Sequence, residues 1–300
     1  MTTNTGSVTP EVLRYTAFSS DPGGGNPAGV VLDAGGLDET GMLAVAAEVG
    51  YSETAFVTPP PPGLDAPPGR GFGIRYFSPL AEVPFCGHAT VATAVALAER
   101  TGPGELVFAT PAGTVPVTVA EAADGTPRAT LTSVEPQVVD VDGADVAEAL
   151  AALDWKPAEL DPALPPRIAY AGARHLVLAA ATRERLAALE YDVERLKAFM
   201  LRLDLTTLQL VWREPTADGR PGTVFHVRDP FPVGGVVEDP ATGAAAAALG
   251  GYLRALGLVA APARLTLHQG HDMGRPGLLE VELRADDPRV RVSGSAARIG

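Results

Sequence analysis

Three short clusters in the sequence combine polar, reactive side chains with apolar neighbours. The first is Ser52-Glu53-Thr54, which leads into the apolar segment 55–57. A carboxylate held against an apolar wall can keep a proton near neutral pH, so Glu53 is a candidate general acid or base. A carboxylate that only caps a turn fits the same pattern, and the sequence leaves both interpretations open.

The second cluster, Cys86-Gly87-His88, comes directly before an Ala-rich apolar stretch with helical character. Unpaired backbone N–H groups at a helix N-terminus can bind a carboxylate, and the helix dipole lowers the pKa of a thiol. Cys86 could then act as a base or nucleophile beside His88. The alternative is a buried cysteine and a histidine that caps the helix. The pair does not match a papain-like protease, whose Cys and His lie far apart in sequence.

The third cluster is Glu238-Asp239-Pro240-Ala241-Thr242-Gly243, which precedes a second Ala-rich stretch at 244–256. Asp239 is a candidate acid or base beside a second anion-binding helix start. The alternative is a set of acids that cap a helix whose Pro stands at an early position. Both Ala-rich helices lack a polar face, so we expect each to be buried on most sides.

Motifs for common cofactors and metals are missing from the sequence. The glycines at 23–25 are followed by Pro27 and by no helix, unlike a Rossmann fingerprint, and the phosphate-loop pattern is absent. No lysine stands in a motif suited to a Schiff base. The five histidines do not follow a metal-binding spacing, and we interpret His268 and His271 as solvated loop residues. We expect no metal site and no cofactor.

Short strand-like segments surround the two apolar helices. They are apolar runs bounded by Gly, Pro and Asn, and they lie at 12–18, 28–32, 54–58, 74–77, 106–110, 113–119, 128–132, 176–181, 208–212, 223–227, 265–268, 278–283 and 290–294. Further helices are predicted at 38–50, 146–153, 183–189 and 193–203. Pro/Gly-rich surface loops are expected at 59–73 and 157–166. Each half therefore runs through strands, a Gly-containing turn, an Ala-rich helix and more strands. This weak repeat predicts two similar α+β domains whose helix N-termini face each other across a cleft.

Composition limits the partners of the protein. The chain has 300 residues, 46% of them hydrophobic and 20% charged, which fits a soluble globular protein. The net charge of −13, from 36 acidic and 23 basic residues, argues against nucleic acid and anionic membranes as partners. The single cysteine, Cys86, excludes an intramolecular disulfide. The N-terminus lacks the apolar core of a signal peptide, and no apolar run is long enough for a membrane span. We expect a cytoplasmic protein.

Five segments, taken in order, resemble those of one family. They are Gly25-Asn26-Pro27-Ala28-Gly29-Val30, Tyr51-Ser52-Glu53-Thr54-Ala55-Phe56, Pro84-Phe85-Cys86-Gly87-His88-Ala89-Thr90, Glu238-Asp239-Pro240-Ala241-Thr242-Gly243-Ala244 and Gln269-Gly270-His271-Asp272-Met273-Gly274-Arg275-Pro276. The sequence resembles the PhzF-like isomerases, named for phenazine biosynthesis, which share the diaminopimelate epimerase fold. The resemblance extends over roughly residues 12 to 298.

The resemblance implies an α+β fold of two pseudo-symmetric domains, each a curved, mostly antiparallel sheet wrapped around a central helix. We place the first domain at residues 1–127, completed by the C-terminal strand 286–300, and the second at 128–285. The family implies a homodimer that uses no cofactor or metal. Its chemistry moves a proton on a small carboxylic acid, by epimerisation or by double-bond migration, in the cleft between the domains.

Site residues follow from the matching motifs. Glu53 resembles the general acid/base of the phenazine enzyme, and His88 and Asp239 resemble its other polar catalytic residues. Asn26 lies in the loop that lines the cleft. The backbone that binds the substrate carboxylate corresponds to Gly87, Thr242 and Gly243.

Two departures from the family leave alternatives open. Ala244 stands at a substrate-binding position where the phenazine enzyme has a serine, so a hydrogen bond to substrate is missing. Cys86 stands where epimerases of this fold carry a catalytic cysteine, but their second cysteine is absent here, which excludes the two-thiol mechanism. A Cys86 thiolate opposite Glu53 or Asp239 stays possible. The alternatives to an acid/base isomerase are a non-catalytic small-molecule binder and a thiol enzyme that uses Cys86.

Overall fold

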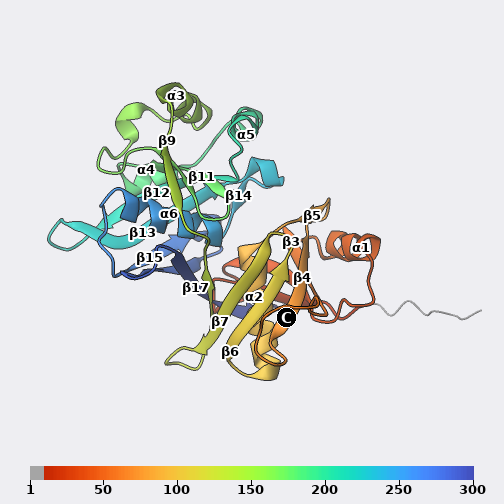
Figure 1. The fold of residues 1–300 in the computed structure, drawn as a ribbon. Helices are drawn as coiled ribbons and strands as arrows, with labels where there is room; N and C mark the ends of the chain where they lie inside the picture. The colour runs from red at the N-terminus through yellow and green to blue at the C-terminus, as the bar shows by residue number, and fades with distance from the viewer. Residues whose placement is uncertain (1–9) are drawn as a thin grey trace, which may run out of the picture.

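A computed structural model describes residues 10–300 of the chain (Figure 1). The helices are α1 (Glu39–Val49), α2 (Gly87–Thr101), α3 (Gly143–Ala152), α4 (Arg183–Ala187), α5 (Val193–Arg202) and α6 (Gly243–Ala255). The strands are β1 (Leu13–Ala17), β2 (Asn26–Val31), β3 (Glu53–Thr58), β4 (Gly71–Phe77), β5 (Glu82–Val83), β6 (Gly104–Thr110), β7 (Gly113–Glu121), β8 (Pro127–Thr132), β9 (Gln137–Asp140), β10 (Arg167–Tyr170), β11 (Arg174–Ala179), β12 (Thr207–Pro215), β13 (Pro221–Pro230), β14 (Glu238–Asp239), β15 (Ala263–Gln269), β16 (Gly277–Leu283) and β17 (Val290–Arg298). The protein is therefore a mixed, sheet-rich α+β structure.

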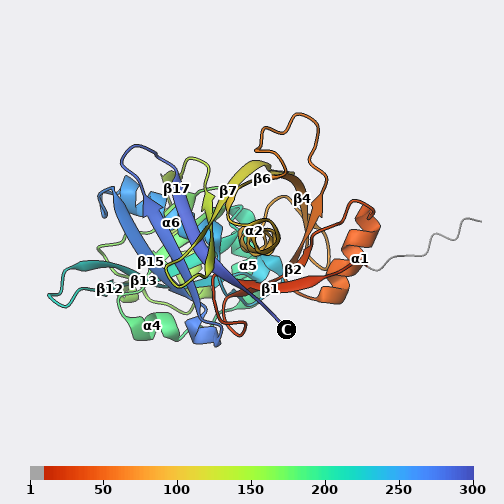
Figure 2. The same cartoon turned by 90° about the horizontal axis from the view of Figure 1, so that it is seen from below.

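Helices α2 and α6 are the buried centre of the structure, as their apolar sequences predicted. Eleven of the fifteen residues of α2 and ten of the thirteen residues of α6 are buried. Helix α2 contacts β1, β2, β3, β7, β8 and β17, and Figure 2 shows it nearly end-on among strands. Helix α6 contacts β9, β10, β11, β16 and β17. Small side chains make this close packing possible, because a Cβ at Gly251 would come within 2.4 Å of Pro136.

The order of strand pairing repeats along the chain. Strand β4 pairs with β5, the chain passes through α2, and β6 then pairs in parallel with β4. In the same way β13 pairs with β14, the chain passes through α6, and β15 pairs in parallel with β13. The pairs β2–β3 and β11–β12 are also parallel and also enclose helices, whereas the remaining pairs of strands are antiparallel.

The C-terminal strand joins the two parts of the sheet. Strand β17 pairs with β16, with β8 and with β1, where Tyr15 lies opposite Arg298. One apolar core extends around both central helices, from Val95 of α2 to Leu249 of α6. Sheet and core are therefore continuous between the two helices.

The remaining helices cover outer faces of the sheet. Asp38 caps α1, since its side chain accepts a hydrogen bond from Gly41 N, and Gly50 ends the helix at φ 71°, in agreement with the helix predicted at 38–50. Met42 and Ala46 of α1 pack against Phe56 of β3. Helices α3, α4 and α5 form a separate apolar cluster with β10, β11 and β12. No helix in residues 10–300 is long and apolar enough to cross a membrane.

Several elements differ from the sequence-based expectation. Strands β5, β9, β10 and β14 were not predicted, because each has at most four residues and no apolar alternation. The predicted loop 59–73 ends earlier, since β4 begins at Gly71, and the predicted loop 157–166 contains a short 3-10 helix at Pro157–Glu159. The most consequential omission is β14, because it carries Asp239.

Candidate active site

The N-termini of the two central helices lie next to each other. Helix α2 begins at Gly87 and α6 at Gly243, and a Cβ built at Gly87 would lie 3.9 Å from Gly243 Cα. The buried ring of Phe18 packs beside this junction, 3.3 Å from a Cβ built at Gly243. The positive ends of two helix dipoles therefore converge on one small region.

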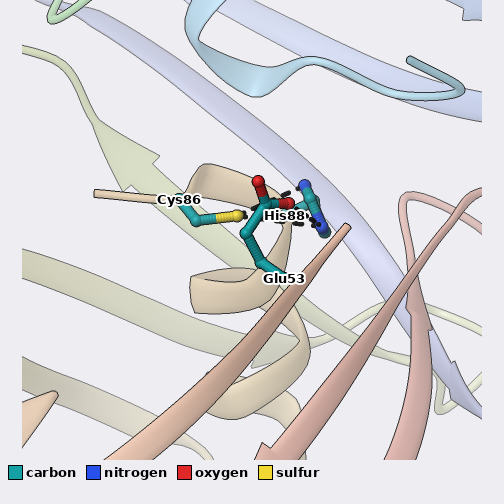
Figure 3. A group of neighbouring side chains, drawn as sticks. All are labelled: Glu53, Cys86 and His88. Atoms are coloured by element: carbon teal, nitrogen blue, oxygen red, sulfur yellow. Dashed lines mark hydrogen bonds and ion pairs between the residues drawn. The ribbon is translucent and has the colours of Figure 1, made fainter. Parts of the chain in front are cut away.

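Three predicted site residues form a compact cluster at the start of α2 (Figure 3). Glu53 is the first residue of β3, Cys86 is the N-cap of α2, and His88 is its second residue. His88 Nε2 lies 3.4 Å from Glu53 Oε2 and 3.7 Å from Cys86 Sγ. The side chains of Glu53 and His88 are only 15% and 7% exposed. A carboxylate, an imidazole and a thiol thus meet in a place almost closed to solvent.

Asn26 connects this cluster to Asp239 on β14. Asn26 Nδ2 donates to Asp239 Oδ1 over 2.7 Å and to the carbonyl oxygen of Ala241 over 3.0 Å. The same nitrogen lies 3.1 Å from His88 Nδ1. An amide nitrogen donates and does not accept, so this contact suits a His88 ring whose Nδ1 carries no hydrogen. Asn26 holds the imidazole and the second carboxylate in fixed relation.

Burial makes Asp239 a weaker acid than an exposed aspartate. It raises the pKa of Asp239 to about 6, although nearby His88 and a hydrogen bond from Thr242 oppose the shift. Thr242 Oγ1 donates to Asp239 Oδ2 over 2.6 Å. Asp239 can therefore hold or release a proton near neutral pH, as a general acid or base requires.

Cys86 does not have the lowered thiol pKa that its place at a helix N-terminus predicted. Burial raises the pKa of the Cys86 thiol well above its usual range, and the charges of Glu53 and Asp239 raise it further. A hydrogen bond from the backbone of Ala89 acts in the opposite direction but is outweighed. Desolvation and two nearby carboxylates thus act against the pKa-lowering effect expected at a helix N-terminus, which gives less support to the thiolate alternative.

The backbone donors at the helix starts are not all available to a ligand. Thr242 N donates to Gln269 Oε1 over 3.0 Å, so this predicted substrate contact is already engaged within the protein. Gly87, Gly243 and Ala244 line a mostly apolar cavity of about 500 Å³, together with Phe85 and Tyr170. This cavity adjoins both helix starts, whereas the four titratable groups lie outside its lining.

Supporting residues that the sequence analysis missed hold Asp239 in place. Gln269 Nε2 donates to the Asp239 carbonyl over 2.9 Å. Arg228 of β13 forms a buried ion pair with Glu238, the neighbour of Asp239. Asp229 lies opposite Asp239 in the β13–β14 register, and burial raises its pKa well above the usual range. Gln269 begins one of the motifs quoted above, but no sequence signal marks Arg228 or Asp229, because their partners come from a different strand.

A family model places this chain among known proteins. The model described as phenazine biosynthesis-like protein matches residues 15–299. The chain belongs to the phenazine biosynthesis-like family. The predicted resemblance is therefore confirmed over nearly the whole chain.

Individual members of the phenazine biosynthesis-like family agree with this assignment. A Deinococcus radiodurans protein named as an uncharacterized isomerase is 36% identical, with 96% of this chain and 94% of the relative covered. The trans-2,3-dihydro-3-hydroxyanthranilate isomerase of Pseudomonas chlororaphis is 33% identical, with 95% of each chain covered. The crystal structure of a Bacillus anthracis phenazine biosynthesis protein of the PhzF family matches with a TM-score of 0.83 and 26% identity, covering 96% of each chain. The predicted enzyme class, an isomerase, is confirmed by these relatives.

Proposed function

We propose that this protein is a cofactor-independent isomerase or epimerase that moves a proton on a small carboxylic acid by acid/base catalysis. The observation that carries the proposal is the arrangement of Glu53, His88, Cys86 and Asp239 within one hydrogen-bonded group, nearly closed to water, where two helix N-termini meet. The isomerase names of the relatives support the same reaction class.

The substrate carboxylate would bind to the helix starts. Backbone N–H groups at Gly87, Gly243 and Ala244, aided by the two helix dipoles, would stabilise its charge. The exposed lining of the adjoining cavity is mostly apolar, so the remainder of the substrate would contact side chains such as Phe85 and Tyr170. The net negative charge of the protein does not prevent this binding, since local backbone dipoles supply the positive potential.

Glu53 would remove the proton from a carbon next to an electron-withdrawing group. His88, 3.4 Å from Glu53, would orient this carboxylate. Asp239, with its pKa of about 6, would hold a proton for return to a second position, and Cys86 would act only as a protonated thiol. Positioned acid/base groups of this kind supply about 10²–10⁴-fold, or about 3–5 kcal/mol. The raised thiol pKa gives less support to a thiol enzyme that uses Cys86 as a nucleophile.

We also propose that α2 and α6 are the centres of two pseudo-symmetric domains, each a curved sheet around its helix. The repeated order of strand pairing supports this division. The first domain would combine 1–127 with 286–300, and β8 would belong with it because β8 contacts α2. The homodimer stays a prediction from family resemblance.

Proton exchange with solvent tests the proposed function. The full chain is incubated in D₂O with a panel of small carboxylic acids that carry an acidic C–H, including trans-2,3-dihydro-3-hydroxyanthranilate, named for the Pseudomonas relative. We expect deuterium incorporation or isomer formation for at least one acid. An acid that raises the melting temperature of the protein but shows neither exchange nor turnover would favour the non-catalytic binder instead. The absence of exchange across the whole panel would contradict an isomerase of this substrate class.

A further inference from the structure

We infer that Glu53, Cys86 and His88 form a binding site for a thiophilic divalent cation of the Zn²⁺ class, and that the bound ion inhibits the enzyme. The site is the cluster drawn in Figure 3, viewed as a set of metal ligands. Binding of the ion depends only on this geometry, whereas its inhibitory effect rests on the proposed function.

The three side chains offer the donor atoms and spacing that a tetrahedral ion needs. One ligand atom of each residue lies within 4.8 Å of the other two. Ligands at about 2.0–2.3 Å from a tetrahedral zinc ion lie about 3.3–3.8 Å from one another. His88 Nε2 lies 3.4 Å from Glu53 Oε2 and 3.7 Å from Cys86 Sγ, which are distances that a tetrahedral ion could bridge. Because Sγ also lies 3.4 Å from Nδ1, the His88 ring would have to turn for its Nε2 lone pair to point at an ion shared with Cys86.

The backbone positions of the three residues are fixed before any ion binds. Cys86 and His88 belong to the first turn of buried helix α2, and Glu53 begins β3, which pairs in parallel with β2. Ser52 Oγ lies 3.5 Å from His88 Nε2, at the partly open side of the cluster. Three protein ligands leave the fourth tetrahedral position to water or to a substrate carboxylate, as in catalytic zinc sites.

The local charge favours a cation. Glu53 and Asp239 bring two carboxyl groups to the site, and within residues 10–300 neither forms an ion pair with a Lys or Arg side chain. These two carboxyl groups would attract a divalent ion. When the ion binds, the S–H bond of Cys86 breaks, a bond from Sγ to the metal forms, and the proton passes to solvent.

The mixture of donors selects the class of ion. Thiolate, imidazole and carboxylate together suit Zn²⁺ and Cd²⁺, whereas Mg²⁺ and Ca²⁺ prefer sites built from oxygen atoms. An ion bound to Glu53 would neutralise the carboxylate that otherwise accepts the substrate proton. Binding should therefore inhibit isomerisation without changing the fold.

Titration of the full chain with CdCl₂ and ZnCl₂ tests the inference without any substrate. We expect one ion per chain, an ultraviolet thiolate-to-cadmium absorption band, and calorimetric release of at least one proton per ion. Cys86→Ser should abolish the band and weaken binding by at least about 10-fold, the lower end of what even outer-shell changes cost a metal site. MgCl₂ should give no comparable signal.

Surface histidines provide the matched control. The rings of His226, His268 and His271 are neighbours, with centroids 5.2 and 5.1 Å apart, so they are the competing source of imidazole ligands to be controlled for. A double variant, His268→Asn with His271→Asn, should keep the cadmium band and the stoichiometry of the wild type.

Two results would overturn the inference. One is the absence of a thiolate band in the wild-type protein, and the other is unchanged affinity in Cys86→Ser. If Cys86→Ser does not fold, Glu53→Gln replaces it, and unchanged affinity there has the same meaning. Because binding is measured without substrate, a failed metal titration is distinguishable from a failed isomerase assay.

Discussion

Asn26 Nδ2 lies 2.7 Å from Asp239 Oδ1, although 213 residues separate the two along the chain. Asn26 begins β2, next to α2, and Asp239 ends β14, just before α6. This single hydrogen bond ties together the parts of the chain that contribute the two candidate carboxylates.

Replacement of Asn26 by Ala should therefore affect both stability and catalysis. Asp239 Oδ1 would lose its amide donor, and an unsatisfied buried acceptor costs about 1–3 kcal/mol. Because the hydrogen bond from the Asn26 side-chain amide helps to lower the pKa of Asp239, its loss should shift that pKa upward. Urea denaturation and the pH profile of activity measure the two effects. A stable variant with an unchanged profile would show that Asn26 does not position Asp239.

The raised pKa of Asp239 predicts a specific dependence of stability on pH. Its pKa is about 6 in the folded state and near its usual value of 3.8 in the unfolded chain. The native state therefore binds more protons between these values, so this group's contribution to stability falls as pH rises from about 4 to 6. The difference corresponds to about 3 kcal/mol at neutral pH.

Asp239→Asn isolates this contribution. Between pH 4 and pH 6, the free energy of unfolding of the variant minus that of the wild type should rise steadily. Urea denaturation across this range measures the difference, and the variant should also lose activity. A difference that stays constant with pH would mean that Asp239 titrates at its ordinary value.

Replacement of Glu53 by Gln should remove the proposed base while preserving the shape of the side chain. We expect activity to fall by at least about 10²-fold, the lower end of the contribution of a positioned base. Circular dichroism should show an unchanged fold. Activity within a few-fold of wild type would exclude Glu53 as the base, and Cys86→Ala provides the comparison for the neighbouring thiol.

The buried ion pair between Arg228 and Glu238 should matter for stability. Arg228→Met would leave Glu238 buried without its partner, at a cost of about 3–5 kcal/mol. The double variant Arg228→Met with Glu238→Leu should recover much of this loss, since no charge is left unpaired. The exposed pair of Arg220 and Asp218 is the control, and Arg220→Ala should leave the free energy of unfolding nearly unchanged. Equal effects at the two sites would contradict this account.

Local patterns in the sequence were enough to predict several parts of the fold. The Ala-rich stretches before 101 and 256 predicted two buried helices because neither has a polar face, and Asp38 and Gly50 marked the ends of α1 through capping chemistry. The motifs around Glu53, His88 and Asp239 also identified the family. Each of these signals lies within a few consecutive residues, so it can be recognised without knowledge of the tertiary structure.

The tertiary structure alone decided which groups meet and how they ionise. The two-residue strand β14 has no pattern of its own, yet its pairing with β13 places Asp239 beside Asn26 and Asp229. Cys86 shows the limit of local reasoning most clearly. Its position at a helix N-terminus predicted a lowered thiol pKa, but burial beside two carboxylates raises it. Desolvation and charge depend on everything that surrounds a group in space, and most of that comes from distant parts of the chain.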